Sequence, residues 1–349
     1  MKISYMKKRE NFYKINQSTL DKFYNEKTKA KKLFIYPHLN AIVTGSPSKA
    51  VTDYLFAEYN VGGNKIKRSL AKMYTKVVIN SKGCLSNGSC RFNGSFNDSM
   101  MIYPCNKKIR VFDFEKGEVR VLVKDGFMAD GLLRELEFRR THNADFILPI
   151  TSSADEEYTE KIIDGRSIVR SGDDYSALRD KAWEIWKSYV GGGKKICACN
   201  YVITLRERFR SMINGLNKPT LDLSSLENLE AEIHKILSDS DVEIEVCMSH
   251  GDLQPGNIWV ESGSEKIYII DWESVSERSA SYDYYALYKD LRRTDGLLSI
   301  ADERSVTSSV VLYEDMIYRI EDLSMLPGDV GSAELNLYAK NVLRKIKNV

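Results

Sequence analysis

No stretch of this sequence approaches the about 20 consecutive apolar residues that a membrane-spanning helix needs. The basic N-terminal segment is not followed by the apolar run of a secretory signal, so we expect no signal peptide. The six cysteines are irregularly spaced, which is typical of neither a disulfide framework nor a zinc site with paired ligands. Cys197 and Cys199 have no second ligand pair in the sequence, so packing is their expected role. These absences together favour a cytoplasmic protein in a reducing compartment.

The composition is that of a folded protein, with 43% hydrophobic and 29% charged residues in a chain of 349. This length allows one large or two ordinary domains. The charge is uneven: residues 1–75 contain 15 Lys and Arg against 5 Asp and Glu, a net of +10, and the remainder carries −8. A solvated helical surface explains such a segment best. Docking on the acidic remainder and contact with an anionic polymer or membrane surface are the alternatives. We expect residues 1–75 to form a basic, mostly helical extension.

The pattern of apolar residues divides the rest of the chain in two. Strands are predicted by alternation or by short apolar runs at 99–103, 109–114, 118–124, 146–150 and 158–163. A charged amphipathic helix is predicted at 132–142. Beyond residue 165 the helical period dominates at 175–190, 201–216 and 223–237 and again from residue 282, with a small β island at 246–271. A strand-rich part followed by a helix-rich part indicates an α+β protein with domains at 76–165 and 166–349.

Two short apolar strands in the β island, 258–260 and 267–270, are separated by a turn-rich link. A hairpin formed by these strands places residue 257 opposite residue 270 or 271. Asn257 and Asp271 are therefore expected to meet at the open end of the hairpin. Their amide and carboxylate oxygens are hard ligands of the kind that suits Mg²⁺ already held by phosphates.

Asp252 precedes Asn257 on a loop stiffened by Pro255, and can project to the same place. Phosphoryl transfer requires in-line positioning, neutralisation of the phosphate oxygens and a carboxylate at the attacking hydroxyl. The spacing of Asp252, Asn257 and Asp271 meets these requirements. The sequence therefore predicts a phosphoryl-transfer site with Asp252 as the base that orients and deprotonates the acceptor hydroxyl.

These residues resemble the catalytic and metal-binding loops of the aminoglycoside phosphotransferase and choline kinase family. The resemblance rests on the pattern His-x-Asp-x-x-x-x-Asn at 250–257, on Ile-Asp-Trp-Glu at 270–273 and on Tyr-Asp at 282–283. It covers residues 249–288. The family shares the protein-kinase fold, so the resemblance implies a bilobal protein-kinase-like architecture. It would have a β-rich N-lobe and a mostly helical C-lobe, preceded here by the helical extension.

The same resemblance implies roles for residues around the loop. Asp283 would be a buried anchor for the backbone of the catalytic loop, and His250 would be structural, with a hydrogen bond to the metal loop. Trp272 stands where protein kinases have Phe, and Glu273 replaces their Gly, which favours a small-molecule kinase over a protein kinase.

The N-lobe resemblance concerns a lysine and a glutamate. Lys124 ends a predicted strand, as the nucleotide-phosphate lysine of the family does, with Lys108 and Lys116 as alternatives. Glu135 and Glu137 lie about 200° apart around the following helix, so only one of them can face that lysine. The family motif favours Glu135.

No Gly-x-Gly-x-x-Gly loop is present. Either the turn at 105–108 or the stretch 93–98 is expected to cover the phosphates through backbone N–H groups. Residues 161–165 resemble the hinge that contacts the adenine edge through its backbone, which implicates Ile163 and Asp164.

The sequence thus predicts a Mg²⁺-dependent phosphotransferase that uses ATP or GTP and acts on an aminoglycoside-, choline- or sugar-like alcohol. No nucleic-acid partner is expected. One alternative is a kinase for a protein or a cell-envelope polymer, and another is a non-catalytic scaffold of kinase fold. An acidic or aromatic surface near the site would suit a cationic acceptor. The residues that could form it are Glu273, Glu277, Asp290 and Asp295, and Trp272, Tyr282, Tyr284, Tyr285 and Tyr288.

Overall fold

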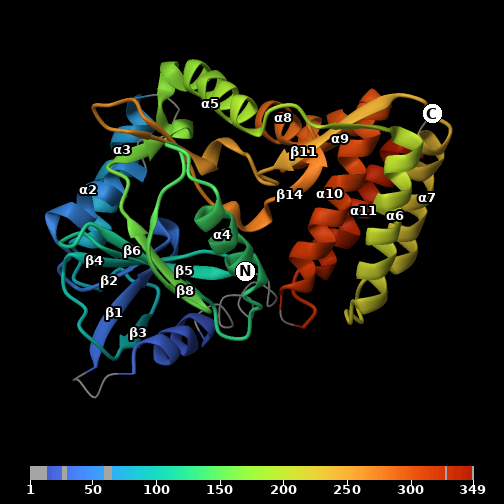
Figure 1. Cartoon of the computed structure of the whole chain (residues 1–349). Coiled ribbons are helices and arrows are strands. Elements are labelled where there is room, and N and C mark those ends of the chain that lie inside the picture. The colour runs from blue at the N-terminus through green and yellow to red at the C-terminus, as the bar shows by residue number, and fades with distance from the viewer. Residues whose placement is uncertain (1–13, 26–29, 59–64, 327, 348–349) are drawn as a thin grey trace. The chain divides into compact units, whose positions relative to one another are not determined.

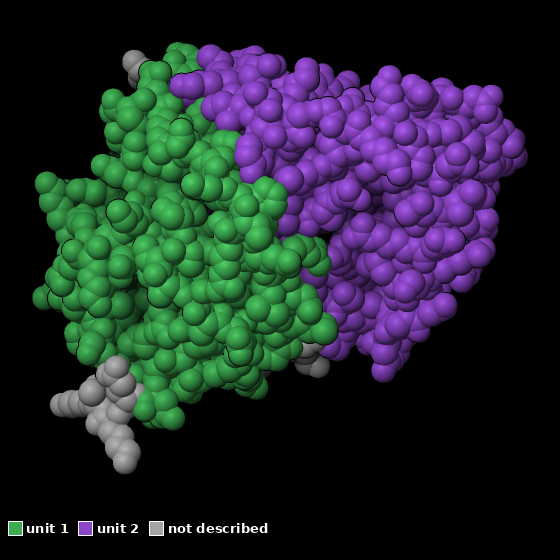
Figure 2. Space-filling view, viewed as in Figure 1, with its two compact units in different colours: residues 1–175, 259–269 green, residues 176–258, 270–349 purple. Residues whose placement is uncertain are grey.

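The computed structural model describes residues 14–25, 30–58, 65–326 and 328–347. The chain forms two compact units (Figure 2). Unit 1 comprises Met1–Tyr175 and Trp259–Ile269, and unit 2 comprises Ser176–Ile258 and Ile270–Val349.

Unit 1 is built on an eight-stranded sheet in which every neighbouring pair of strands is antiparallel. The strand order is β3-β1-β2-β4-β5-β6-β8-β7 (Figure 1). The strands are β1 Lys31–Tyr36, β2 Ala41–Val43, β3 Ser89–Phe92, β4 Met100–Pro104, β5 Lys108–Asp113, β6 Glu118–Val123, β7 Ile150–Ala154 and β8 Glu157–Lys161. Helices α2 Lys49–Glu58, α3 Lys65–Ile79 and α4 Asp130–Thr141 accompany the sheet, as does a helical stretch over residues 14–23.

The hairpin of β5 and β6 confirms part of the alternation seen in the sequence. Arg110 and Arg120 are partly exposed between buried neighbours, whereas Phe112, Leu122 and Val123 are buried next to other buried residues. The carboxylate of Asp113 accepts hydrogen bonds from the two following backbone N–H groups and starts the turn. Gly117 completes the turn at φ +70°, where a side chain would be strained.

The expected boundary at residue 75 does not coincide with an edge of this sheet. Strands β1 and β2 precede it, yet they lie between β3 and β4, and Leu33, Ile35 and Ile42 are fully buried. The sheet therefore needs residues 31–43, and they are not a helical addition. The basic composition of the segment conceals them because their apolar runs, 33–36 and 41–43, are short, and the exposed Lys31 and Lys32 precede the first. Residues 1–13, 26–29 and 59–64 of the expected extension lie outside the described residues.

The strand expected at 146–150 is also corrected, because β7 begins only at Ile150. Before it, Ile147 forms a single bridge with Ile269. Pro149 has no N–H group and cannot continue a ladder, which explains the late start.

The end of unit 1 includes a second, three-stranded sheet. Its strands are β13 Ile267–Ile269, β12 Ile258–Glu261 and β9 Gly165–Ser167, in that order. Because β9 pairs with β12, the residues after 165 remain with unit 1, and the unit boundary lies at residue 175 instead of the expected 165.

Unit 2 consists of helices and a three-stranded sheet of order β10-β11-β14 (Figure 1). Its long helix α10 is buried over most of its surface and packs against α6, α7 and α9, and its buried positions include Ser308, Ser309, Glu314 and Asp315 besides apolar residues. The elements are α5 Tyr175–Val190, β10 Lys194–Cys197, α6 Ala198–Gly215, α7 Leu223–Ser238, β11 Glu243–Ser249, β14 Ser276–Ser279, α8 Ser281–Tyr288, α9 Thr294–Glu303, α10 Val306–Ser324 and α11 Ser332–Lys347.

The predicted α+β class, strand-rich first and helix-rich second, is confirmed. Over the described ranges, no helix has both the length and the apolar character that a membrane crossing requires.

Candidate active site

The hairpin predicted from the two apolar runs is present as β12 and β13. The N–H group of Glu261 donates to the carbonyl of Lys266 at 2.9 Å near the turn. At the open end, the N–H group of Ile270 donates to the carbonyl of Asn257 at 2.9 Å. Asn257 therefore lies opposite Ile270, one residue before Asp271, in the register that the sequence predicted.

The carboxylate of Asp252 lies in unit 2 and is held at both oxygens. Its Oδ1 accepts a hydrogen bond from Nε of Arg292 at 2.9 Å. Its Oδ2 accepts from Gln254 Nε2 and from Asn257 Nδ2, both at 3.1 Å. Asn257 Nδ2 also donates to the backbone carbonyl of Asp252 at 2.9 Å. The loop thus orients a carboxylate that keeps a small exposed fraction of 15%, as a general base requires.

The same contacts decide which atom Asn257 can offer a cation. Its amide nitrogen donates to Asp252, so its amide oxygen is the ligand atom that remains for a metal. Asp271 follows β13 in the left-handed backbone conformation, at φ 71° and ψ 56°. Aspartate adopts this region more readily than most residues, yet it is uncommon, and such backbone is concentrated at functional sites. An amide oxygen and a carboxylate fit Mg²⁺ as hard donors.

His250 is completely buried and connects the two loops. Its Nε2 lies 3.1 Å from the carbonyl of Ile270, and its Nδ1 lies 3.2 Å from the N–H group of Asp252. These partners require a neutral ring with the proton on Nε2. Burial lowers the pKa of His250, and the carboxylates of Asp283, Asp252 and Asp271 only partly oppose this. The ring is thus a fixed link between the loops.

The carboxylate of Asp283 lies beneath the loop. It accepts hydrogen bonds from the backbone N–H groups of His250 at 2.8 Å and Gly251 at 3.1 Å, and from the Ser249 hydroxyl at 3.0 Å. Trp186 Nε1 donates at 2.9 Å to Oδ2 of this carboxylate, the oxygen that also accepts from the N–H group of His250. A buried carboxylate with this many donors fixes the backbone that leads into Asp252.

Gly251 has a steric reason to be glycine. Its φ is +79°, and a Cβ atom there would collide with the carbonyl of Ser274 and the guanidinium of Arg278. The chain thus turns sharply between His250 and Asp252.

Arg292 is a site residue that sequence reasoning missed. Its guanidinium binds the Asp252 carboxylate and the carbonyl of Gly251, and it forms an ion pair with the fully buried Asp315 of α10. It also stacks on the ring of Tyr318 at 3.6 Å. Burial opposes its charge, but the neighbouring tyrosines and carboxylates outweigh burial and raise its pKa well above the ordinary value. The residue follows α8 without a motif, so no local signal could have identified it.

Unit 1 contains the expected helix glutamate, but with a different lysine. Glu135 on α4 is fully buried and forms ion pairs with Lys108 Nζ at 3.4 Å and Arg139 at 3.0 Å. Tyr158 donates a further hydrogen bond to it at 2.9 Å. Lys108 lies at the start of β5 and was the alternative to Lys124. The partner of Glu135 is therefore corrected to Lys108, because the lysine at the start of β5 points to the buried carboxylate.

Lys124 has another environment. Its Nζ donates to the backbone carbonyl of Cys105, in the turn that joins β4 and β5. Burial lowers its pKa to about 8, with the charge of Cys105 opposing this. Of the two loops expected to cover phosphates, the turn at 105–108 is thus the one directly beside Lys124.

The expected hinge residues lie between β8 and β9. The carbonyl of Asp164 accepts from the N–H group of Ser262 at 2.7 Å, which ties this segment to the turn between β12 and β13. Ile163 and Asp164 border a cavity of about 580 Å³ in unit 1, together with Tyr54 of α2.

The aromatic residues considered for a cationic cage divide into two groups. Trp272, Tyr282 and Tyr285 are buried and belong to the packing of unit 2. Tyr284 and Tyr288 stack on each other at 4.8 Å and contact Trp183 edge-on, and Tyr284 also meets the ring of Tyr285 edge-on at 6.1 Å.

Comparison with family models finds no match, and comparison with curated proteins finds none either. Several solved structures are similar to this chain. A choline/ethanolamine kinase family protein from Mesorhizobium loti has 9% identity over 72% of this chain and 92% of its own, with a TM-score of 0.45. An ethanolamine kinase from Plasmodium vivax has 13% identity over 88% and 97%, with a TM-score of 0.43. A GDP complex of an aminoglycoside 2'-phosphotransferase-IIIa mutant has 15% identity over 70% and 89%, with a TM-score of 0.41.

Proposed function

We propose that this protein is a Mg²⁺-dependent phosphotransferase that moves the γ-phosphate of ATP or GTP to a hydroxyl group of a small molecule. The proposal rests on the Asp252 carboxylate, which accepts hydrogen bonds from Arg292 and Asn257. Asn257 in turn lies opposite Ile270, the residue before Asp271. An oriented carboxylate beside two oxygen donors meets the requirements of phosphoryl transfer.

In this proposal Asp252 accepts a hydrogen bond from the acceptor hydroxyl and takes its proton as the oxygen attacks the γ-phosphorus. The bond from that phosphorus to the bridging oxygen breaks, and the nucleoside diphosphate leaves. Asn257 and Asp271 would hold Mg²⁺, which neutralises charge on the phosphate oxygens when bound. In unit 1, Lys108 with Glu135, and Lys124 beside the 105–108 turn, would supply the positive charge for the phosphates. Ile163 and Asp164 would contact the adenine or guanine base of the nucleotide through their backbone.

Two roles of the surrounding residues belong to the same proposal. His250 and Asp283 would keep the loop in place without touching the substrates, because their side chains bond the backbone groups of His250, Gly251, Asp252 and Ile270. The acceptor would be a choline-, aminoglycoside- or sugar-like alcohol. The scaffold alternative is disfavoured because a scaffold has no need of an oriented Asp252 carboxylate. The alternative of a polymer or protein acceptor is tested in the same assay, with a peptide or a cell-envelope polymer in place of the small alcohol.

The test is nucleotide consumption by the purified full chain with Mg²⁺ and a panel of choline-, ethanolamine-, aminoglycoside- and sugar-type alcohols. The variant Asp252→Asn should lower kcat by at least a hundredfold while the nucleotide Kd changes less than threefold, because the metal ligands remain. Asp302→Asn is the matched control: its carboxylate is exposed and pairs with Lys345, and kcat should be unchanged. Near-normal turnover of Asp252→Asn would refute the assigned base. Tight Mg²⁺-nucleotide binding without transfer to any alcohol, peptide or polymer would favour the scaffold.

A further inference from the structure

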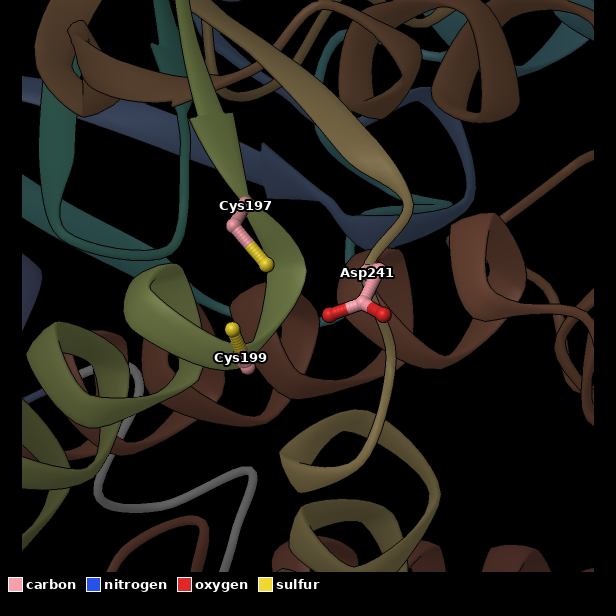
Figure 3. A group of neighbouring side chains, drawn as sticks. All are labelled: Cys197, Cys199 and Asp241. Carbon is pink, nitrogen blue, oxygen red and sulfur yellow. The ribbon is translucent and has the colours of Figure 1, made fainter.

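A second cluster of metal-ligating side chains lies in unit 2. Cys197 ends β10, Cys199 lies in the first turn of α6, and Asp241 belongs to the turn between α7 and β11. Figure 3 shows the two sulfur atoms and the carboxylate pointing toward a common centre. The sequence pairs only the two cysteines, and the fold brings the carboxylate to them.

The distances suit one ion. The ligand atoms of the three side chains all lie within 4.8 Å of one another. Two thiolates on a tetrahedral zinc ion, each at about 2.3 Å, are about 3.8 Å apart, so ion binding requires only a small side-chain movement. Borderline-soft divalent ions prefer such mixed sulfur and oxygen donors, whereas Mg²⁺ does not.

Backbone hydrogen bonds hold the two segments in place. The N–H group of Ala198 donates to the carbonyl of Val242 at 2.9 Å, and that of Cys199 donates to the carbonyl of Ser240 at 3.3 Å. Strands β10 and β11 continue this contact, with Cys197 opposite Glu243. The ligands therefore come from backbone that is already ordered, which lowers the entropic cost of binding.

The side chain of Cys197 also contacts the turn that carries Asp241. The Cys197 thiol donates to the carbonyl of Ser240 at 3.2 Å. Two thiolates and a carboxylate placed this close together repel one another unless a cation lies between them. A divalent ion supplies that cation and displaces the thiol protons on binding.

We propose that Cys197, Cys199 and Asp241 form a binding site for a zinc-type divalent ion. The fourth position is open to water or to the carbonyl of Ser240. The bound ion joins the start of α6 to the turn that precedes β11, and β11 leads directly into the catalytic loop at His250. This site is independent of the proposed phosphotransferase activity.

The test uses the full chain, kept reduced and freed of metal, and titrated with Co²⁺ and with Zn²⁺. We expect one equivalent of Co²⁺ to give a thiolate-to-cobalt charge-transfer band that Zn²⁺ abolishes. Cys199→Ser and Asp241→Asn should each weaken Zn²⁺ binding at least tenfold. Cys247→Ser is the control, because Cys247 is outside the cluster, and it should bind normally.

Three further measurements complete the test. Zn²⁺ should protect Cys197 and Cys199 from alkylation and raise the Tm of the wild type but not of Cys199→Ser. Zn²⁺ binding should persist in the Asp271→Ala variant, which separates this site from the proposed Mg²⁺ site. Absence of the band at stoichiometric Co²⁺, unchanged affinity in Cys199→Ser, or a disulfide between the cysteines that survives reductant would overturn the proposal.

Discussion

Replacement of Arg292 by Met tests the most connected residue of the candidate site. Methionine keeps a flexible stem of similar length and removes the guanidinium. Two carboxylates then lose a cation: Asp252 at the proposed reaction centre and Asp315, which is fully buried in α10. The change therefore acts on stability and on catalysis through different partners.

The loss of stability in Arg292→Met depends on the cation that Asp315 retains. Removal of one member of a buried ion pair costs about 3–5 kcal/mol because the other charge is left uncompensated. Asp315 retains Arg319, whose Nε lies 2.7 Å from its Oδ2, so the low end applies. We expect Arg292→Met to lower the free energy of unfolding by about 3 kcal/mol. Asp252 keeps Gln254 and Asn257 on Oδ2 but loses its partner on Oδ1, so its carboxylate is free to rotate.

The assays are urea unfolding, followed by tryptophan fluorescence, and kcat at saturating nucleotide below the unfolding transition. We expect kcat to fall at least tenfold in Arg292→Met, with nucleotide Kd changed less than threefold. Arg292→Lys, which keeps the charge but not the planar fork, should lie between the two proteins in both assays.

Arg319→Met is the matched control. Arg319 binds the other oxygen of Asp315, so the variant should lose stability comparably, by about 2–3 kcal/mol. Because the contacts of Arg319 go to α10 and α11 and not to Asp252, kcat should be retained. Equal losses of kcat in Arg292→Met and Arg319→Met, or full kcat in Arg292→Met, would refute the positioning role of Arg292.

Three further predictions concern the proposed metal ligands and the lysines of unit 1. Asp271→Ala should abolish Mg²⁺-dependent nucleotide binding in calorimetry and Asn257→Ala should weaken it about tenfold, because each removes one oxygen ligand; unchanged binding in both would contradict the metal assignment. Lys108→Met should weaken nucleotide binding at least tenfold, whereas replacement of the exposed turn lysine, Lys116→Met, should not. The reverse order would refute Lys108 as the lysine that binds the phosphates. Because burial lowers the pKa of Lys124 to about 8, the unfolded chain binds a proton that the folded chain lacks between about pH 8 and pH 10.5. The free energy of unfolding, relative to that of Lys124→Met, should therefore rise by up to about 1.4 kcal/mol per pH unit in this window. Parallel pH profiles of the two proteins would show that folding does not lower the pKa of Lys124.

The sequence alone was sufficient for structure formed by neighbours in the chain. The hairpin of β12 and β13, with Asn257 opposite Ile270, follows from two apolar runs and a turn. The helix at 175–190 matches α5, because a long run with a helical period carries a strong local signal. The loop from His250 to Asn257 is equally local, since its residues contact one another across a few positions.

Only the tertiary structure decided the contacts between distant segments. Arg292 reaches Asp252 across 40 positions, Lys108 reaches Glu135 across 27, and Asp241 meets two cysteines that precede it by a helical hairpin. Strands β1 and β2 enter the middle of a sheet whose other members follow more than forty residues later. A buried ion pair or a distant strand pairing leaves no periodic pattern at either end, because its partners are chosen by packing and charge after the chain has folded back on itself. Local periodicity therefore predicted many of the elements, and a short motif predicted the loop at 250–257, whereas the partners of Asp252 and Glu135 became visible only when those elements packed.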